Sequence, residues 1–384
     1  MNYAGLKPKN PYDFVPLEEH CHRGFSPAGF LPLVSKGRLS GYIKCELFTE
    51  TPLYIGSGEE AGWSSLQYIP ATSIKGMIRS VAETVSSSCL STLGGEHLDF
   101  VPEEFHPCRN LADLCMCCAL FGMVPAQATG KELEEAAGLA GRVMFSDALH
   151  ADNDLKMSEL ELPARYSKKK KKVMVVLGKP QPKHVSFYFA GHGKKRRILG
   201  RKFYFHHDDY AQTLSDYRAA YEEMLKSNCR TVKINAISEH QEFSFNVDFI
   251  SLQESELGVL LYALALEEGM RHHLGFAKPY GLGCVKVSIQ EIALTAENSY
   301  LDYGSGEESR RKLEDSEWRS WCQEAWRRNG ESSTTESREK LQEILKWPQE
   351  GRFRYPRLDD FFKKDGANKI SLGEYQEGVR PEGN

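Results

Sequence analysis

The stretch FSFNVDFISLQESELGVLLYALALEEG, residues 243 to 269, decides the fold. Its first eight residues alternate large apolar with polar side chains, which is typical of a strand with one buried face. Ser251 and Glu254 then form a capping box, and four leucines at helical spacing follow. The stretch therefore predicts a strand that leads into a buried helix ending near Gly269. The leucines of the buried stripe are Leu257, Leu260, Leu261 and Leu264.

Working outward from this stretch, the chain contains two strand, helix, strand units. The second unit closes with CVKVSI (284–289), which alternates like a strand. The first unit consists of GYIKCELFTETPLYIGSG (41–58), a helix over IPATSIKGMIRSVAETV (69–85) with Thr72 or Ser73 as its cap, and the strand GRVMFSDA (141–148). Two such units predict an α+β fold with a split βαβ sheet of the ferredoxin or RNA-recognition type.

The loop HHLGFAKPYGLG (272–283) joins the last helix to the last strand. A dinucleotide fingerprint follows a strand and opens a helix, so this position excludes one, and a phosphate-loop motif is absent too. Two interpretations stay open. The glycines make a tight turn, or they let backbone N–H groups approach phosphates, with Lys278, His272 and His273 as further donors.

Four of the ten cysteines gather in HPCRNLADLCMCCALFG (106–122). The C-x-x-C spacing of Cys115 and Cys118 lets two thiolates converge on one tetrahedral ion, and Cys108 lies seven residues upstream. We predict a structural zinc site with His106 as the fourth ligand, although His97 or Cys89 would also complete it. A metal-free cysteine-rich turn is the alternative, and the side chain of Cys117 is expected to point away.

The net charge of -4 hides one dense basic segment between Arg165 and Lys202. Such a segment suits a polyanion, and interleaved aromatic residues add stacking surface for single-stranded RNA. The lysine run 168–172 alone is more typical of a solvated loop tip, and the strand GRKFYF can also pack into the core. The cations that we single out here are Arg165, Lys168, Lys195, Arg196, Arg201 and Lys202.

No basic and apolar leader opens the chain, and its longest apolar run (257–266) is too short to cross a bilayer. We therefore expect a soluble, cytoplasmic protein without a membrane partner.

Taken together, six motifs resemble the RAMP superfamily of CRISPR-associated proteins. They are TPLYIGSG, YIPATSIKGMIRS, the cysteine knuckle running into CCALFG, GRVMFSDA, ILGRKFYFHH and HHLGFAKPYGLGCVKV. The similarity is greatest to the backbone subunits, called Cas family seven, of type III and type III-derived effectors such as type VII. It covers about residues 10 to 290.

The resemblance implies a modified RNA-recognition fold at 1–300, with a zinc knuckle at about 89–122 and a β-hairpin thumb at about 151–240. A helical, partly disordered extension would occupy 301–384. Such a subunit polymerises along CRISPR RNA within a ribonucleoprotein that recognises target RNA in antiviral defence. Its expected partners are the guide, the target, copies of itself and other effector subunits, including a separate nuclease.

Carried over to this chain, the resemblance places guide phosphates at the start of the helix 69–85 and along the glycine-rich loop. Helix N-termini favour anions on electrostatic grounds as well. The residues concerned are Ser73, Lys75, Arg79, His272, His273, Gly275, Lys278, Gly281 and Gly283.

Catalysis is where the chain departs from its relatives. Slicing subunits carry an aspartate between the first strand and the helix, but here that loop has only Glu59 and Glu60. Asp147 belongs to the motif FSDA, which is structural in the family. We therefore expect a binding subunit that does not slice. The alternative is an endoribonuclease that slices target RNA or processes precursor RNA, for which the candidate acids and bases are His20, His22, His272 and His273.

The C-terminal part is polar and predicts two short helices, at 309–329 and 337–347. Trp318, Trp321 and Trp326 are the expected packing anchors. The segment 354–362 is expected to dock on the core or on a neighbour, and the last fifteen or so residues look disordered.

Overall fold

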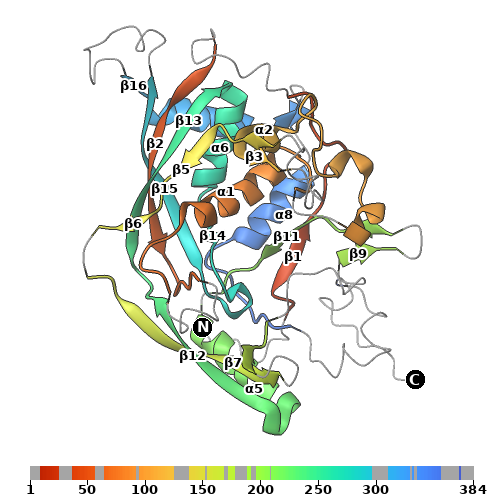
Figure 1. Ribbon diagram of the computed structural model, residues 1–384, viewed down its shortest axis with the longest axis vertical. Coiled ribbons are helices and arrows are strands. Elements are labelled where there is room, and N and C mark those ends of the chain that lie inside the picture. Colours follow the sequence, from red (N-terminus) through yellow and green to blue (C-terminus); the bar gives the residue numbers. More distant parts are fainter. Residues whose placement is uncertain are drawn as a thin grey trace.

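The structure of the chain is a computed structural model (Figure 1). The structure describes residues 9–25, 37–56, 65–91, 95–124, 138–151, 154–167, 172–177, 188–191, 196–207, 209–295, 310–328, 331–332, 335–355 and 372. The predicted disordered tail lies outside these residues, apart from Leu372.

The centre of the molecule is a curled antiparallel sheet of seven strands with the order β14-β15-β2-β13-β5, joined by β16 and β6. Its three long strands are β2 (Leu39–Thr49), β13 (Glu242–Leu252) and β15 (Cys284–Thr295). They match the predicted strands and extend beyond them. The short strands are β5 (Val143–Phe145), β6 (Leu149–His150), β14 (His272–His273) and β16 (Arg310–Lys312).

One face of this sheet is buried because its strands alternate. Strand β13 has the burial pattern expected from the sequence, with its apolar side chains inside and the polar ones outside. Figure 1 shows α1, α6 and α8 on the same side of the sheet. The inward side chains of the two central strands are Ile43, Cys45, Leu47, Phe243, Phe245, Val247 and Phe249.

Both predicted helices form, but their caps differ from the prediction. Helix α1 (Ala71–Val85) begins after Pro70 and has no side-chain cap, so Thr72 and Ser73 lie within its first turn. Asp147 instead accepts a hydrogen bond from the first helical N–H, that of Ala71, at 2.7 Å. Helix α6 (Glu254–Ala265) has its capping box two residues later than predicted, at Gln253 and Glu256.

A second, smaller sheet fills the predicted insertion. Strand β7 (Met157–Ser167) pairs with β12 (Cys229–Ile237) and with β8 (Lys172–Val175), and α5 (Tyr210–Leu225) packs on them. This unit lies at one end of the molecule (Figure 1). Its apolar core includes Tyr280 of the glycine-rich loop, so the insertion packs directly against that loop.

The C-terminal helices pack on the core. Helix α7 (Asp315–Glu324) contacts α6, with Trp318 and Trp326 buried and Trp321 partly buried. Helix α8 (Thr335–Leu345) contacts β1 (Tyr12–Val15) and β11 (Arg201–Tyr204), which pair with each other.

Short elements complete the chain. They are α2 (Met116–Phe121), η2 (Gly95–Phe100), η3 (Glu103–Phe105), η5 (Lys226–Asn228), η6 (Lys278–Tyr280), β3 (Gly122–Met123), β4 (Leu139–Ala140), β9 (Phe189–Ala190), β10 (Arg197–Ile198), β17 (Arg327–Arg328) and β18 (Glu331–Ser332). Within the described ranges, no helix has the length and apolar character needed to cross a membrane.

Candidate metal centre and nucleic-acid interface

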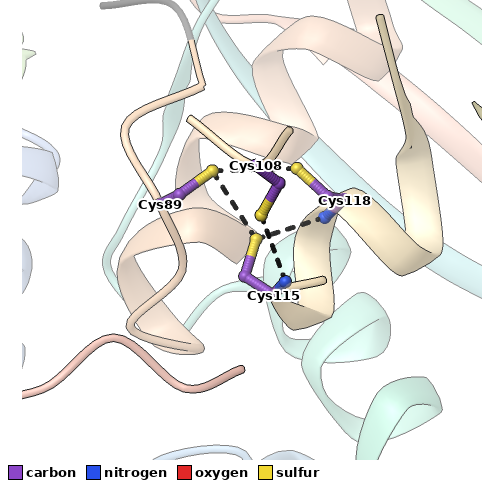
Figure 2. A group of neighbouring side chains, drawn as sticks. All are labelled: Cys89, Cys108, Cys115 and Cys118. Carbon is purple, nitrogen blue, oxygen red and sulfur yellow. Dashed lines mark hydrogen bonds between the residues drawn. The ribbon is translucent and has the colours of Figure 1, made fainter. Parts of the chain in front are cut away.

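Four cysteine side chains meet in the interior beside α1. Cys115 and Cys118 flank the first turn of α2, Cys108 comes from the preceding loop, and Cys89 follows the end of α1. All four are buried, and their sulfur atoms lie within 4.8 Å of one another. Figure 2 shows the sulfurs pointing toward a common centre.

The spacing of these sulfurs fits one tetrahedral ion. A Zn–S bond of about 2.3 Å gives a tetrahedron with edges of about 3.8 Å. The Sγ of Cys89 lies 3.7 Å from that of Cys118 and 3.6 Å from that of Cys115. Four thiolates at these distances match a closed, structural zinc site, without an open position for water or substrate.

The fourth candidate ligand of this site is Cys89 and not His106. The His106 Nε2 atom lies 3.1 Å from the carbonyl oxygens of Leu98 and Val101, so its ring is engaged elsewhere. The side chain of His97, the other histidine candidate, lies outside the described residues. Cys117 points away as expected: its Sγ lies 3.4 Å from the Ser86 hydroxyl, and burial raises the pKa of its thiol to about 12.

The four thiols are not equivalent. Hydrogen bonding with Cys108, Cys118 and Cys89 holds the pKa of the Cys115 thiol well below its usual value. The contacts with Cys108, Cys115 and Cys118 instead raise the pKa of Cys89. Thiols crowded in this way compete for protons, and a divalent cation removes that competition by displacing them.

Arg79 faces this cluster and not the solvent. Its guanidinium donates to the Glu83 carboxylate at 2.8 Å, to the Gly122 carbonyl at 3.0 Å and to the Cys118 sulfur at 3.6 Å. The RNA contact predicted for Arg79 is therefore replaced by a structural role. Glu83 lies four residues further along the helix, but Cys118 and Gly122 are 39 and 43 residues away along the chain, so no local pattern revealed these two acceptors.

Lys75 lies one turn earlier on α1, and it is still a candidate for the phosphate contact predicted at the start of this helix. Within the described part of the chain, its ammonium group has no hydrogen-bond acceptor and no carboxylate partner. Burial, together with the positive charge of Arg79, lowers the pKa of Lys75. An anion bound at this helix start would relieve both effects. Ser73 is partly exposed on the same turn.

The glycines of the loop are required by the protein's own backbone. Gly283 has a φ of +80°, and a Cβ atom there would lie 1.9 Å from the Leu274 carbonyl oxygen. Gly275 has a φ of +76°, and its Cβ would lie 2.5 Å from the Tyr54 carbonyl oxygen. Gly281 is packed in the same way against His207. The tight-turn interpretation explains these glycines without any RNA.

The histidine pair lies in the interior. The exposed fraction is 1% for His272 and 8% for His273. Their Nε2 atoms lie 3.1 Å and 3.0 Å from the carbonyl oxygens of Leu264 and Phe205, respectively. Burial lowers the pKa of His272 to about 4 and that of His273 well below its usual value. Both rings are therefore uncharged at neutral pH, and the structure gives them an interior role in place of the predicted phosphate contact.

Lys202 and Lys278 form a second cationic group, at the glycine-rich loop. The Lys202 Nζ atom lies 3.7 Å from the centre of the Tyr12 ring and 2.9 Å from the Tyr188 hydroxyl. Burial, reinforced by the charge of Lys278, lowers the pKa of Lys202 to about 7, and burial lowers that of Lys278 to about 8. Neither lysine has a carboxylate partner among the residues that the structure describes. Two partly buried cations without a counter-ion form a candidate anion site.

Unpartnered nitrogen atoms lie near Lys278. The buried Nδ1 atoms of His206 and His273 have no hydrogen-bond partner in the described structure, and burial, with a further contribution from the charge of Lys278, lowers the pKa of both rings. The sequence placed Lys202 and Lys278 in separate motifs, and it gave no sign that Tyr12 and Tyr188 would enclose Lys202.

The structure also places Arg201, one of the cations singled out for RNA, in the interior. It is buried, pairs with Glu83 at 3.5 Å, and donates to the backbone oxygens of Ser88 and Cys89. Arg165 remains exposed on β7, and Arg196 lies over the Phe100 ring. Four predicted residues, namely Lys168, Lys195, Glu59 and Glu60, lie outside the described residues.

The remaining histidine candidates lie near the cysteine centre. The exposed His20 ring is 3.4 Å from a Glu104 oxygen, and the backbone N–H of His22 bonds to Ser87. They are remote in sequence from Lys202 and Lys278.

The helix-free face of the large sheet is a poor surface for a phosphate backbone. Lys44 and Lys312 both contact the Glu291 carboxylate, at 3.5 Å and 3.3 Å. Burial and the negative charge of Glu242 raise the pKa of Glu46. Each of these two ammonium groups already has a carboxylate partner, whereas Lys75, Lys202 and Lys278 have none among the described residues.

Comparison with known proteins supplies the family. A search of curated proteins finds no match to the chain. A family model of the RAMP superfamily matches residues 46–286, a segment that begins within β2 and ends within β15 and so includes both strand, helix, strand units and the insertion. Because this match covers more than half of the chain, the protein belongs to the RAMP superfamily of CRISPR-associated proteins.

Proposed function

We propose that this protein is a CRISPR RNA-binding backbone subunit of a type III or type III-derived effector, such as type VII. The observation that carries the proposal is the family match across both strand, helix, strand units. The sheet order β15-β2-β13-β5 supports it, because this order arises when two such units interleave as in the ferredoxin-like fold. The core then comprises residues 1–300, and 301–384 is an extension.

The guide backbone would bind at three cationic positions. Lys75 offers one phosphate contact at the start of α1, and Lys202 with Lys278 offers another at the glycine-rich loop. Arg165 adds an exposed charge on the insertion, which we propose to be the thumb. Lysines without carboxylate partners can accept a phosphate without breaking an ion pair, and each such contact releases counterions.

In this proposal the subunit binds RNA without slicing it. The buried, hydrogen-bonded state of His272 and His273 argues against the alternative in which this pair processes precursor RNA, since neither ring is positioned to exchange protons with a substrate. Copies of the subunit would line the guide in the cytoplasm, next to other effector subunits and a nuclease that cuts the target.

We also propose that Cys89, Cys108, Cys115 and Cys118 hold a structural zinc ion. A zinc ion bound by four thiolates supplies stability and no catalysis. The chain contributes the rest: α2 presents two of the sulfurs, and the N–H groups of Cys115 and Cys118 donate to the sulfurs of Cys108 and Cys115 at 3.3 Å and 3.5 Å.

Guide binding can be tested by fluorescence anisotropy with a labelled, repeat-containing RNA. The double variant Lys202→Gln/Lys278→Gln is expected to lose affinity by at least tenfold, because it removes both cations of one site. The matched control is Lys44→Gln/Lys312→Gln on the sheet face, where both charges are already paired with Glu291. Equal affinities for wild type, test and control variants, or no binding at all, would contradict the proposal.

A further inference from the structure

Two arginines donate to the sulfurs of the cysteine centre. The Arg23 Nη1 atom lies 3.1 Å from the Cys108 sulfur, and the Arg79 Nη2 atom lies 3.6 Å from the Cys118 sulfur. Hydrogen bonds from a charged donor stabilise a thiolate more than a thiol. The two arginines come from distant parts of the chain and reach two different ligands, so the centre receives positive charge from both.

Among the described residues, the immediate surroundings contain one more arginine, Arg201, and a single carboxylate, Glu83, in contact with these groups. Glu83 accepts from Arg79 at 2.8 Å and pairs with Arg201 at 3.5 Å. Arg23 has no carboxylate partner in the described structure: its other hydrogen bonds go to the backbone oxygens of Glu104, His106 and Asp113. Two guanidinium groups therefore share one carboxylate, while the third has only sulfur and carbonyl acceptors.

The charges balance for one class of ion only. Four thiolates and Glu83 carry five negative charges. Three guanidinium groups and a divalent ion carry five positive charges, so the assembly is neutral. A monovalent ion would leave a net negative charge and a trivalent ion a net positive one. An uncompensated charge in a buried position costs several kcal/mol.

Arg79 also links helix α1, to which it belongs, to the cysteine centre. Its guanidinium contacts three groups: the Glu83 side chain on α1 itself, the Cys118 sulfur on α2, and the Gly122 carbonyl at the start of β3. The same arginine therefore neutralises a ligand and fastens the helix that carries Lys75 to the centre.

We propose that Arg23 and Arg79 set the charge of this centre, so that it selects and retains a divalent, thiophilic ion as a complete tetrathiolate complex. The inference rests on the proposed metal site and is independent of RNA binding. The two arginines are positioning residues that act on the ion through Cys108 and Cys118, and they do not ligate it.

The test measures metal release from the full-length protein loaded with Co²⁺ or Zn²⁺. With an excess of a colorimetric chelator, Arg23→Gln and Arg79→Gln are each expected to release the ion about tenfold faster than wild type, the usual effect of losing an outer-sphere partner. Arg79→Lys, which keeps the charge but not the geometry, is expected to fall in between. The thiolate-to-cobalt charge-transfer absorption reports whether four thiolates remain bound before release.

Arg38→Gln is the matched control. Arg38 has a side-chain exposure of 18%, against 21% for Arg79, and it also pairs with a carboxylate, Glu256, but it touches no sulfur. If Arg79→Gln and Arg23→Gln release the metal ion no faster than Arg38→Gln, the inference is overturned. A weaker RNA affinity of Arg79→Gln with unchanged metal release would also overturn it, and would make Arg79 an RNA contact. Wild-type protein that holds no metal would contradict the metal site itself.

Discussion

At the scale of single residues, the unpaired lysines carry the functional argument. Lys202 and Lys278 lie in a region rich in tyrosine and histidine, and their lowered pKa values reflect the loss of water around both ammonium groups. In the proposed function, a bound phosphate would replace that lost solvation. Binding and protonation are therefore linked at this site, and pH separates it from an ordinary surface patch.

The pH dependence of guide binding gives a first prediction. Because the pKa of Lys202 is about 7 and that of Lys278 about 8, both ammonium groups lose their protons as the pH rises through 7 to 9. RNA affinity of the wild type should fall over this range at constant salt. Anisotropy titrations at pH 6 and pH 9 measure it, and an equal fall in Lys202→Gln/Lys278→Gln would contradict the assignment.

The same shift has the opposite effect on folding. Lys202 in the unfolded chain keeps its proton up to about pH 10.5, whereas in the folded protein it loses it near pH 7. The unfolded state thus binds more protons between these values, so this residue makes the free energy of unfolding rise with pH. Urea titrations of the RNA-free protein at pH 7 and pH 9 should show a smaller rise in Lys202→Gln than in wild type.

Lys75 allows a separate prediction for the start of α1. Lys75→Gln should weaken guide binding about tenfold and reduce the salt dependence by roughly one counterion, since one phosphate contact is lost. Lys233→Gln is the control, because Lys233 is exposed and its ammonium group is already 2.7 Å from the Glu159 carboxylate. An unchanged salt slope in Lys75→Gln would exclude a phosphate contact there.

Residue patterns in the sequence predicted only part of the site. Cys108, Cys115 and Cys118 could be identified because their spacing is local. The preference for His106 over Cys89 was wrong because the chain path between α1 and α2, which spacing does not reveal, brings Cys89 into reach. Arg79 was assigned to RNA by the family resemblance and Arg201 by its place in the basic segment, whereas most of their acceptors come from distant segments.

At the scale of elements, the glycine-rich loop is a structural joint. It connects α6 to β15 and packs against the insertion through Tyr280. Its position between a helix and a strand was predictable from sequence. The need for glycine at positions 275 and 283 was not predictable, because the carbonyl oxygens that leave no room for a Cβ atom come close only in the folded chain.

A pair of glycine variants tests the role of this joint. Gly283→Ala should destabilise the fold by at least about 2 kcal/mol, since an alanine there has an unfavourable φ and a Cβ that meets the Leu274 carbonyl. Gly269→Ala carries a similar φ, +78°, with nothing within 4 Å of the added atom. Urea denaturation should therefore show a smaller loss for Gly269→Ala, and equal losses would contradict the packing argument.

At the scale of the whole molecule, the strand and helix patterns predicted the core, because alternation and helical spacing directly record which side chains are buried. A β-hairpin in the insertion was expected only from the family resemblance, and neither the pairing of β12 with β7 nor the docking of α8 on β1 and β11 was predicted. These depend on contacts between segments that no local pattern connects.

The metal centre contributes to the stability of the whole fold in this account. Cys89→Ser should lower the zinc content and reduce the midpoint of thermal unfolding by about 5 °C or more, because binding energy at a structural site is folding energy. His106→Ala should retain the zinc. Metal analysis and thermal unfolding of both variants check this, and zinc loss from His106→Ala with retention in Cys89→Ser would reverse the ligand assignment.

Nucleic acid that copurifies with the full-length protein tests the central claim most directly. Expressed together with a CRISPR array, the protein should carry RNA of uniform length with one repeat-derived end, and the Lys202→Gln/Lys278→Gln variant should carry less of it. Protein that purifies free of RNA, or with RNA of random sequence, would contradict its assignment as a guide-binding subunit.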